Sequence, residues 1–154
     1  MGDLSKNFDW REFACPCCGL AAIDERLVHE VLQPVRDHFR RPIRINSGCR
    51  CKRHNDALRF CAHCCMSLVL HDRVDCPHCG RLTRQRSSIT SRHLPDSEGT
   101  CHAADVVLVS DKTGPIQVAN YIDTIEIMQL RGGLGRYRSF THVDLRSNPA
   151  RWYN

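Results

Sequence analysis

The segment Ala103-Ala104-Asp105-Val106-Val107-Leu108-Val109 has the strongest strand pattern in the chain. Its run of β-branched and apolar residues favours a buried β-strand. One acidic residue, Asp105, stands at the head of this run. A buried carboxylate needs a partner, and a metal ion would supply one. The segment therefore predicts a strand with a polar site at its beginning.

Helices and shorter strands are expected on both sides of this segment. Apolar residues recur at helical spacing from Asp24, a suitable N-cap, to about Arg40, and Pro34 should kink or split that helix. Ile43 and Ile45 alternate with polar residues over 42–46, which predicts a half-buried strand. The other expected elements are a short helix over about 52–60, a helix over 115–128, a chain break at Gly132-Gly133, and strands over 134–137 and 140–145. This mixture predicts an α+β fold, a small antiparallel sheet flanked by helices.

Size and composition suit a single globular domain over residues 1–154, which we expect to be a monomer. The chain is 42% hydrophobic and 25% charged, and its formal charge is +5. That charge favours an anionic partner. No stretch approaches the roughly 18 apolar residues of a membrane span, so we expect no membrane segment. The N-terminus lacks the apolar run of a secretory signal, so we expect synthesis in the cytoplasm without a signal peptide.

Three short segments carry residues suited to a catalytic metal: Ser91-Arg92-His93, Ala103-Ala104-Asp105 and Thr141-His142-Val143-Asp144. Two neutral imidazoles and one carboxylate form a common catalytic zinc set, which leaves the fourth position for water. Asp144 lies two residues beyond His142 in a strand-like stretch, so the two side chains should share a face. His102 has the opposite parity to Asp105 and should point away from the metal.

Further motifs accompany this set, in a recognisable order. They are PIRINSGCR (42–50), His54-Asn55, GGLGRY (132–137), SFTHVD (139–144), Arg151-Trp152 and, at the start, Asn7-Phe8 with Phe13-Ala14-Cys15. Together they resemble the zinc D-Ala-D-Ala carboxypeptidases and the related phage and bacterial peptidoglycan peptidases, whose fold the hedgehog signalling domain shares. The resemblance covers most of the chain and leaves out residues 61–90.

By this resemblance, His93, Asp105 and His142 bind one catalytic zinc ion. Arg50 matches the family arginine that holds a substrate carboxylate or steadies the developing oxyanion, a task that suits a guanidinium. Ser91 matches a serine that hydrogen-bonds the substrate backbone. The resemblance implies a zinc metallopeptidase, either a carboxypeptidase or an endolysin-type endopeptidase, that hydrolyses peptidoglycan stem peptides. Such an enzyme would reach the cell wall only when another protein releases it, as phage lysis enzymes are released.

The chain departs from the family pattern near the metal ligands. Asp105 follows His93 by twelve residues, a longer spacing than the family's, and residues 95–99 should form an inserted surface loop. Many members have an acidic general base three residues before the last histidine, where this chain has Ser139. We therefore nominate Asp144 as the base, with the alternative that it orients His142. The missing acid also favours a competing hypothesis, a non-catalytic zinc-binding module.

Residues 61–82 have the pattern of an inserted zinc ribbon, two CxxC pairs joined by a short hairpin. The paired cysteines are Cys61, Cys64, Cys76 and Cys79. Cys65 could replace Cys64. We expect a structural zinc ion here, in addition to the catalytic one. Because the ribbon lies between Arg50 and His93 in the chain, we favour a flap over the peptidase cleft. Nearby arginines would suit the phosphates of a nucleic acid, which is the less favoured interpretation of the ribbon. The competing non-catalytic module would use the ribbon to bind nucleic acid or protein.

The remaining cysteines leave alternatives open. Cys15, Cys17 and Cys18 could combine with Cys49 and Cys51 in a second structural metal site. A disulfide of the Cys15–Cys51 type after export is the other interpretation. We expect Cys101 to be a buried thiol.

Overall fold

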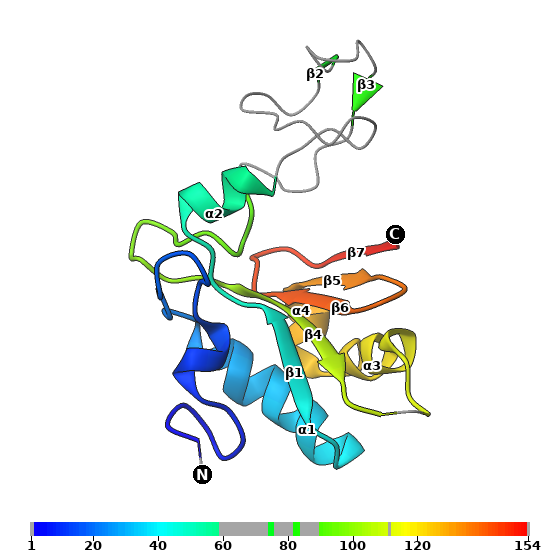
Figure 1. The fold of residues 1–154 in the computed structure, drawn as a ribbon. Coiled ribbons are helices and arrows are strands. Elements are labelled where there is room, and N and C mark those ends of the chain that lie inside the picture. Colours follow the sequence, from blue (N-terminus) through cyan, green and yellow to red (C-terminus); the bar gives the residue numbers. More distant parts are fainter. Residues whose placement is uncertain (1, 59–73, 76–81, 84–89, 111, 154) are drawn as a thin grey trace.

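Five strands form one sheet in the computed structural model, which describes residues 2–58, 74–75, 82–83, 90–110 and 112–153. The strand order is β1-β4-β6-β5-β7 (Figure 1). The strands are β1 (Ile43–Ser47), β4 (Ala103–Leu108), β5 (Gly133–Arg136), β6 (Thr141–Asp144) and β7 (Ala150–Tyr153). All four strands expected from the sequence are present, and the 103–109 segment forms β4, between β1 and β6.

The expectation of a purely antiparallel sheet is wrong at one edge. Strand β7, which the sequence did not predict, pairs with β5 in parallel, while the other pairs in this sheet are antiparallel. Its residues, ARWY, show neither a regular alternation nor an apolar run. Arg151 instead holds β7 in place, because its guanidinium donates to the carbonyls of Met128 and Gly132 and to the carboxylate of Asp123.

The first long helix begins after Asp24 and ends at Phe39, as the apolar spacing predicts. The side chain of Asp24 accepts a hydrogen bond from the backbone N–H of Arg26, which confirms its capping role. The helix changes type at the proline: η2 (Leu27–Leu32) is π-helical and α1 (Gln33–Phe39) is α-helical. Pro34 has no N–H to donate, which interrupts the regular hydrogen-bond ladder at this point. The predicted split is therefore a change of helix type within one continuous segment.

The helix expected over 115–128 is two helices, α3 (Pro115–Ile122) and α4 (Glu126–Leu130). Thr124 ends α3, because its hydroxyl and its backbone N–H both donate to the carbonyl of Tyr121. Ile125 is extended and leads directly into α4. Side-chain competition for backbone groups is what disfavours threonine inside helices, and here it overrides the continuous apolar spacing.

The shorter elements complete the described chain. A 3-10 turn, η1 (Trp10–Phe13), packs near β1, and α2 (Lys52–Ala57) follows the turn after β1. Strands β2 (Val74–Asp75) and β3 (Leu82–Thr83) form a separate antiparallel pair. The ribbon cysteines Cys61, Cys64, Cys76 and Cys79 lie outside the described residues. None of the described helices has the length and apolar character needed to cross a bilayer.

Helices α1, α3 and α4 lie on one face of the sheet, whereas α2 lies beyond its end, and the core is between the sheet and the helices on that face (Figure 1). Ala104, Val106 and Leu108 of β4 belong to this core together with Leu27, Val31 and other apolar residues of the first helix. Successive side chains of a strand point to opposite faces. Asp105 therefore projects from the other face of the sheet, which positions the candidate site.

Candidate metal centre

One row of residues crosses all five strands on the face away from the helices. The row pairs Ser47 with Asp105, Asp105 with His142, His142 with Gly135 and Gly135 with Trp152. Strand β1 reaches this register through a bulge between Ile45 and Ser47, which places Ser47 opposite Asp105. Bulges of this kind re-aim side chains and are frequent beside active sites. The topology thus assembles the site from strands that are far apart in sequence.

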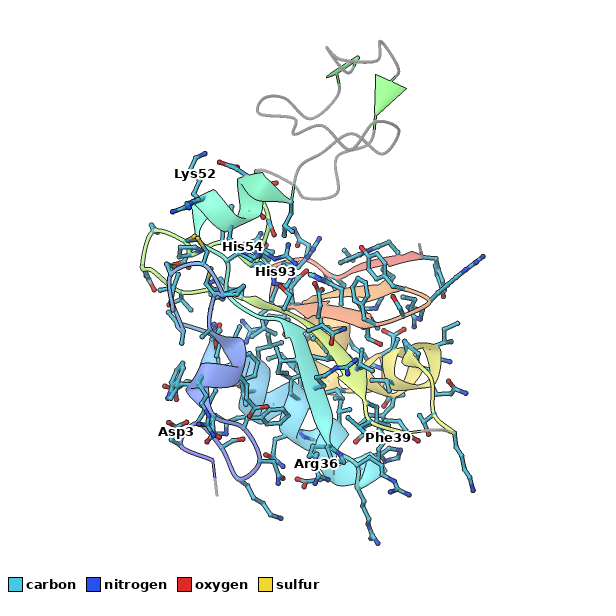
Figure 2. The ribbon with its side chains drawn as sticks, viewed as in Figure 1. Asp3, Arg36, Phe39, Lys52, His54 and His93 are labelled. Atoms are coloured by element: carbon cyan, nitrogen blue, oxygen red, sulfur yellow. The ribbon has the colours of Figure 1, made fainter. Side chains whose placement is uncertain are left out.

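His93, Asp105 and His142 come together as the sequence predicts. One potential ligand atom from each lies within 4.8 Å of the others. Nδ1 of His142 lies 2.7 Å from Oδ1 of Asp105, and Nε2 of His93 lies 3.4 Å from the same oxygen. His93 is contributed by the segment before β4 and lies at the α2 end of the domain (Figure 2). The three side chains converge with the spacing of a small-ion ligand set.

In each imidazole, the nitrogen turned away from Asp105 forms a hydrogen bond. This bond fixes which nitrogen faces the point where the three side chains meet. Nδ1 of His93 lies 2.6 Å from the carbonyl oxygen of Gly48 and must donate to it, so Nε2 keeps its lone pair. Nε2 of His142 lies 3.0 Å from Oδ2 of Asp144, so its proton belongs there and Nδ1 faces Asp105. Metal-binding histidines characteristically donate their second N–H to a carbonyl or carboxylate in this way.

The electrostatics of the three groups also suit a cation. Burial would raise the pKa of Asp105, but its close contacts with His142 and His93 outweigh it and the pKa falls. Burial lowers the pKa of His93, which favours the neutral ring that a metal needs. Burial also opposes charge on His142, but Asp105 and Asp144 outweigh it and raise the pKa. The 2.7 Å contact between Nδ1 of His142 and Oδ1 of Asp105 is a hydrogen-bond distance. A bound cation would replace the shared proton and move the two atoms apart, and the donor set fits zinc.

Arg50 binds the carboxylate oxygen of Asp105 that the two histidines do not contact. Its Nη2 donates to Oδ2 of Asp105 at 3.0 Å, and its Nε donates to Oγ of Ser47 at 2.9 Å. The backbone N–H of Arg50 donates to the carbonyl of His93. The arginine and its ion-pair partner are each only 12% exposed. Arg50 therefore orients Asp105 and places a positive charge next to the metal position.

Asp144 shares the face of His142, as expected, but it is completely enclosed. Both carboxylate oxygens also accept from Arg146, Oδ1 from Nε at 2.7 Å and Oδ2 from Nη2 at 2.5 Å. Burial would raise the pKa of Asp144, but hydrogen bonds with Arg146 and His142 outweigh it and lower the pKa to about 2. A carboxylate held in this way is well suited to orient an imidazole.

Sequence reasoning missed Arg146 and gave Trp152 only a packing role. The guanidinium of Arg146 lies over the Trp152 ring at 5.1 Å, and the same ring lies 5.3 Å from that of His142. The glycines of β5 are the signal that could have found them. A Cβ on Gly133 would lie 2.4 Å from Oδ2 of Asp144, and a Cβ on Gly135 would lie 2.6 Å from the indole.

A cavity of about 410 Å³ opens beside the convergence point. Its wall consists of Thr90, Ser91, Arg92, His142, Asp144 and Arg146. The hydroxyl of Ser91 accepts a hydrogen bond from the backbone N–H of His93, so the serine is fixed next to the metal ligand. The predicted substrate-binding residue thus lies on the wall of a cavity that the metal position adjoins.

The structure also shows where His102, Ser139 and residues 95–99 lie. His102 points away from the metal position, because its ring nitrogens contact the carboxylates of Asp24 and Asp96. Ser139, where the family has its acid, is exposed in the turn between β5 and β6. Residues 95–99 form an exposed turn, as expected of an inserted loop.

The six described cysteines are free thiols. Cys101 is fully buried, as expected, and its thiol hydrogen-bonds that of Cys49. Cys15, Cys18 and Cys51 form a second group whose sulfur atoms lie within 4.8 Å of one another.

One comparison with known proteins finds a similarity, and it covers the first part of the chain. No curated protein and no solved structure matches the chain. Residues 6–63 match the family model described as Peptidase M15. The match includes Arg50 and stops before His93, Asp105 and His142, so the convergence of those three residues is an independent observation. The first part of the chain is therefore similar to the M15 peptidases, and the three converging residues lie beyond the matched part.

Proposed function

We propose that the protein is a zinc metallopeptidase that hydrolyses peptidoglycan stem peptides, as a carboxypeptidase or an endopeptidase. The observation that carries this proposal is the convergence of His93, Asp105 and His142, with the outer nitrogen of each imidazole held by Gly48 or Asp144. The match of residues 6–63 to the Peptidase M15 model supports a peptide substrate. We further propose that the enzyme acts on the cell wall after release from the cytoplasm.

Zinc, when bound, would polarise the scissile carbonyl and lower the pKa of a bound water. His93, Asp105 and His142 would hold the ion. Asp144 keeps the proton of His142 on Nε2, so that Nδ1 remains available as a ligand. Arg50 keeps one oxygen of Asp105 occupied, which turns the other toward the two imidazoles. These contacts build the ligand set before any substrate arrives.

The substrate would occupy the cavity beside His142. Ser91 on its wall can hydrogen-bond a peptide backbone, and the guanidinium groups of Arg92 and Arg146 border the same space. Stem peptides carry carboxylates, which guanidinium groups bind well. The positive charge of Arg50 beside Asp105 would oppose the negative charge that develops on the scissile oxygen.

Of the two roles considered for Asp144, the contacts favour orientation of His142. Both oxygens are hydrogen-bonded to Arg146, and the side chain has no exposed surface. A general base must reach the water or substrate whose proton it takes. We propose that Asp144 acts through His142.

Hydrolysis of purified cell walls tests the proposal. We expect zinc-loaded wild type to clear a cell-wall suspension and to release peptide fragments, and we expect His142→Ala to do neither. His38→Ala is the matched control, because His38 is exposed on α1, far from the metal position, and should leave activity unchanged. A strong chelator should abolish wild-type activity, and added zinc should restore it. Inactivity of the zinc-loaded wild type, or full activity of His142→Ala, would contradict the proposal.

A non-catalytic zinc-binding module remains the second candidate, and one observation favours it. Among the described residues that line the cavity, the only carboxylate is Asp144, which is tied to Arg146. A module of this type would bind zinc through the same three residues. Tight zinc binding that depends on His142, with no cleavage of any stem peptide, would support the module over the enzyme.

A further inference from the structure

The N-terminal cysteines form a cluster that the peptidase site does not use. Cys15 and Cys18 lie on a loop in which the backbone N–H of Gly19 donates to the carbonyl of Cys15, and that of Cys15 donates to the carbonyl of Leu20. Gly19 closes this loop with φ +77°, a conformation that disfavours other residues. The spacing Cys-x-x-Cys-Gly on a tight turn is typical of one half of a tetrahedral metal site.

Cys51 comes to the same place from a different part of the chain. Its backbone N–H donates to the sulfur of Cys15 at 3.3 Å. The sulfur atoms of Cys15, Cys18 and Cys51 all lie within 4.8 Å of one another. Zinc–sulfur bonds of about 2.3 Å would place tetrahedral thiolates about 3.8 Å apart, so closing the cluster around an ion requires movements of about an ångström.

Cys17 lies outside the 4.8 Å group but next to Cys18 in the chain, and it is the candidate fourth ligand. Its thiol is a hydrogen-bond partner of the Cys51 thiol, while the thiol of Cys18 is linked to both Cys15 and Cys51. Three thiol groups from two segments therefore form the cluster, and a fourth stands next to it in the chain. Thiols gain little from contact with one another, whereas a soft divalent ion binds a cluster of them strongly.

Backbone N–H groups surround the sulfur atoms, as they do around metal-bound thiolates. The sulfur of Cys15 accepts from the N–H of Cys51 at 3.3 Å, and the sulfur of Cys51 accepts from the N–H of His54 at 3.4 Å. The positive charges of Arg50 and Arg53 act on Cys15 and Cys17 respectively, and would offset the charge of a thiolate centre.

We propose that Cys15, Cys18 and Cys51 bind a structural zinc ion, with Cys17 as the fourth ligand once its side chain turns toward the cluster. This centre is separate from the His93–Asp105–His142 set, because the two groups share no ligand. The position of this cysteine centre in the fold indicates a structural role. Cys51 directly follows Arg50, and the same turn is held to the N-terminal segment by the hydrogen bond from the N–H of Cys49 to the carbonyl of Phe13. The centre would cross-link the N-terminal arm to the turn that presents Arg50 to Asp105.

Alkylation of the native full-length protein, purified under reducing conditions and mapped by mass spectrometry, tests this assignment. Cys17 and Cys18 are exposed, so as free thiols they should react at once with iodoacetamide. We expect both to be protected, and to become reactive when a chelator is added. Rapid alkylation without a chelator would show free thiols and overturn the proposal. Protection that only a reductant removes would show a disulfide and overturn it as well.

Zinc content measured by elemental analysis provides the second arm. Cys18→Ser changes an exposed residue, and Cys51→Ser keeps a side chain that can cap α2, so neither should prevent folding. Each should lower the zinc content by about one equivalent per chain and expose Cys17 to alkylation. Cys49→Ala is the matched control, since Cys49 precedes Arg50 but pairs with Cys101, and it should retain the full zinc content. Unchanged zinc in the two serine variants would overturn the assignment.

His142→Ala separates this proposal from the proposed peptidase function. That variant should lose the catalytic equivalent of zinc and still protect Cys17 and Cys18. The two metal centres can therefore fail independently in these measurements.

Discussion

Gly135 has no side chain, and the indole of Trp152 fills the space where one would lie. This contact places the indole next to the ring of His142, whose Nδ1 faces Asp105. Gly133 similarly leaves room for the ion pair between Asp144 and Arg146. At the scale of single residues, the metal position therefore depends on the absence of two side chains as well as on the ligands themselves.

The substitution Asp144→Asn distinguishes the two roles of this residue. The amide keeps the size of the side chain but loses the charge that holds Arg146 and the Nε2 proton of His142. We expect zinc affinity to fall by about 10- to 100-fold, the usual effect of losing a ligand-orienting partner, with activity largely restored at saturating zinc. Zinc titration and kcat at saturating zinc are the measurements. Asp96→Asn, on the exposed loop, is the control.

The opposite pattern would assign Asp144 to proton transfer. In that case kcat would collapse at saturating zinc while zinc affinity stayed near the wild-type value, because a general base acts only on the chemical step.

At the scale of elements, Asp123 connects the end of α3 to two strands. Its carboxylate pairs with Arg136 of β5 and with Arg151 of β7. Burial would raise the pKa of Asp123, but the hydrogen bonds from Arg136 and Arg151 outweigh it and the net shift is downward. These pairs hold the parallel edge strand that carries Trp152, and through it they support the ring of His142.

The shift at Asp123 implies a pH-dependent contribution to stability. Its pKa in the folded state is below that of the unfolded chain, about 3.9 for aspartate, so the unfolded state binds the proton more readily. The ion pairs of Asp123 contribute fully to the free energy of unfolding above about pH 4. This contribution is lost as the pH falls through the lowered pKa of Asp123. We expect Asp123→Asn to unfold at lower denaturant concentration than wild type near neutral pH, with the difference shrinking below about pH 4.

Urea denaturation over a series of pH values measures this effect. Asp37→Asn, an exposed substitution on α1, is the control and should not reproduce the pH trend. A wild-type advantage that stays constant as the pH falls would exclude Asp123 as its source.

At the scale of the whole molecule, zinc should stabilise the fold because the ligands are brought together only in the folded chain. His93, Asp105 and His142 come from separate segments, and an unfolded chain cannot hold them within 4.8 Å. A ligand at 100 times its Kd stabilises the folded state by about 2.7 kcal/mol. For a chain of this size, that corresponds to a rise in Tm of about 5 to 10 °C.

Thermal unfolding of the chelator-treated protein, with and without added zinc, checks this expectation. His142→Ala should lose the part of the rise that the catalytic centre contributes, whereas His38→Ala should keep all of it. An identical zinc-induced rise in wild type and His142→Ala would contradict zinc binding at the predicted centre.

Local sequence patterns were sufficient for much of the fold. The apolar spacing of 24–40, the alternation of 42–46 and the apolar run of 103–109 each predict an element that the structure contains. Strand parity also placed Asp144 beside His142 and turned His102 away from Asp105. These predictions succeeded because periodicity alone decides which side chains share a face.

Elements that depend on single hydrogen bonds, local or distant, escaped prediction. The break between α3 and α4 depends on Thr124 bonding to Tyr121, and β7 is held by Arg151 binding to carbonyls of another segment. Neither interaction leaves a periodic pattern in the sequence.

The sequence by itself determined the candidate ligands, His93, Asp105 and His142, and the positions of most helices and strands, because residue type and spacing are local properties. Only the tertiary structure decided that Ser47, Asp105, His142, Gly135 and Trp152 form one row across five strands. It also paired Arg50 with Asp105, Arg146 with Asp144 and Cys51 with Cys15. The register of this sheet depends jointly on the bulge in β1, the parallel pairing of β7 with β5 and the packing of the helices. No single segment encodes those contacts.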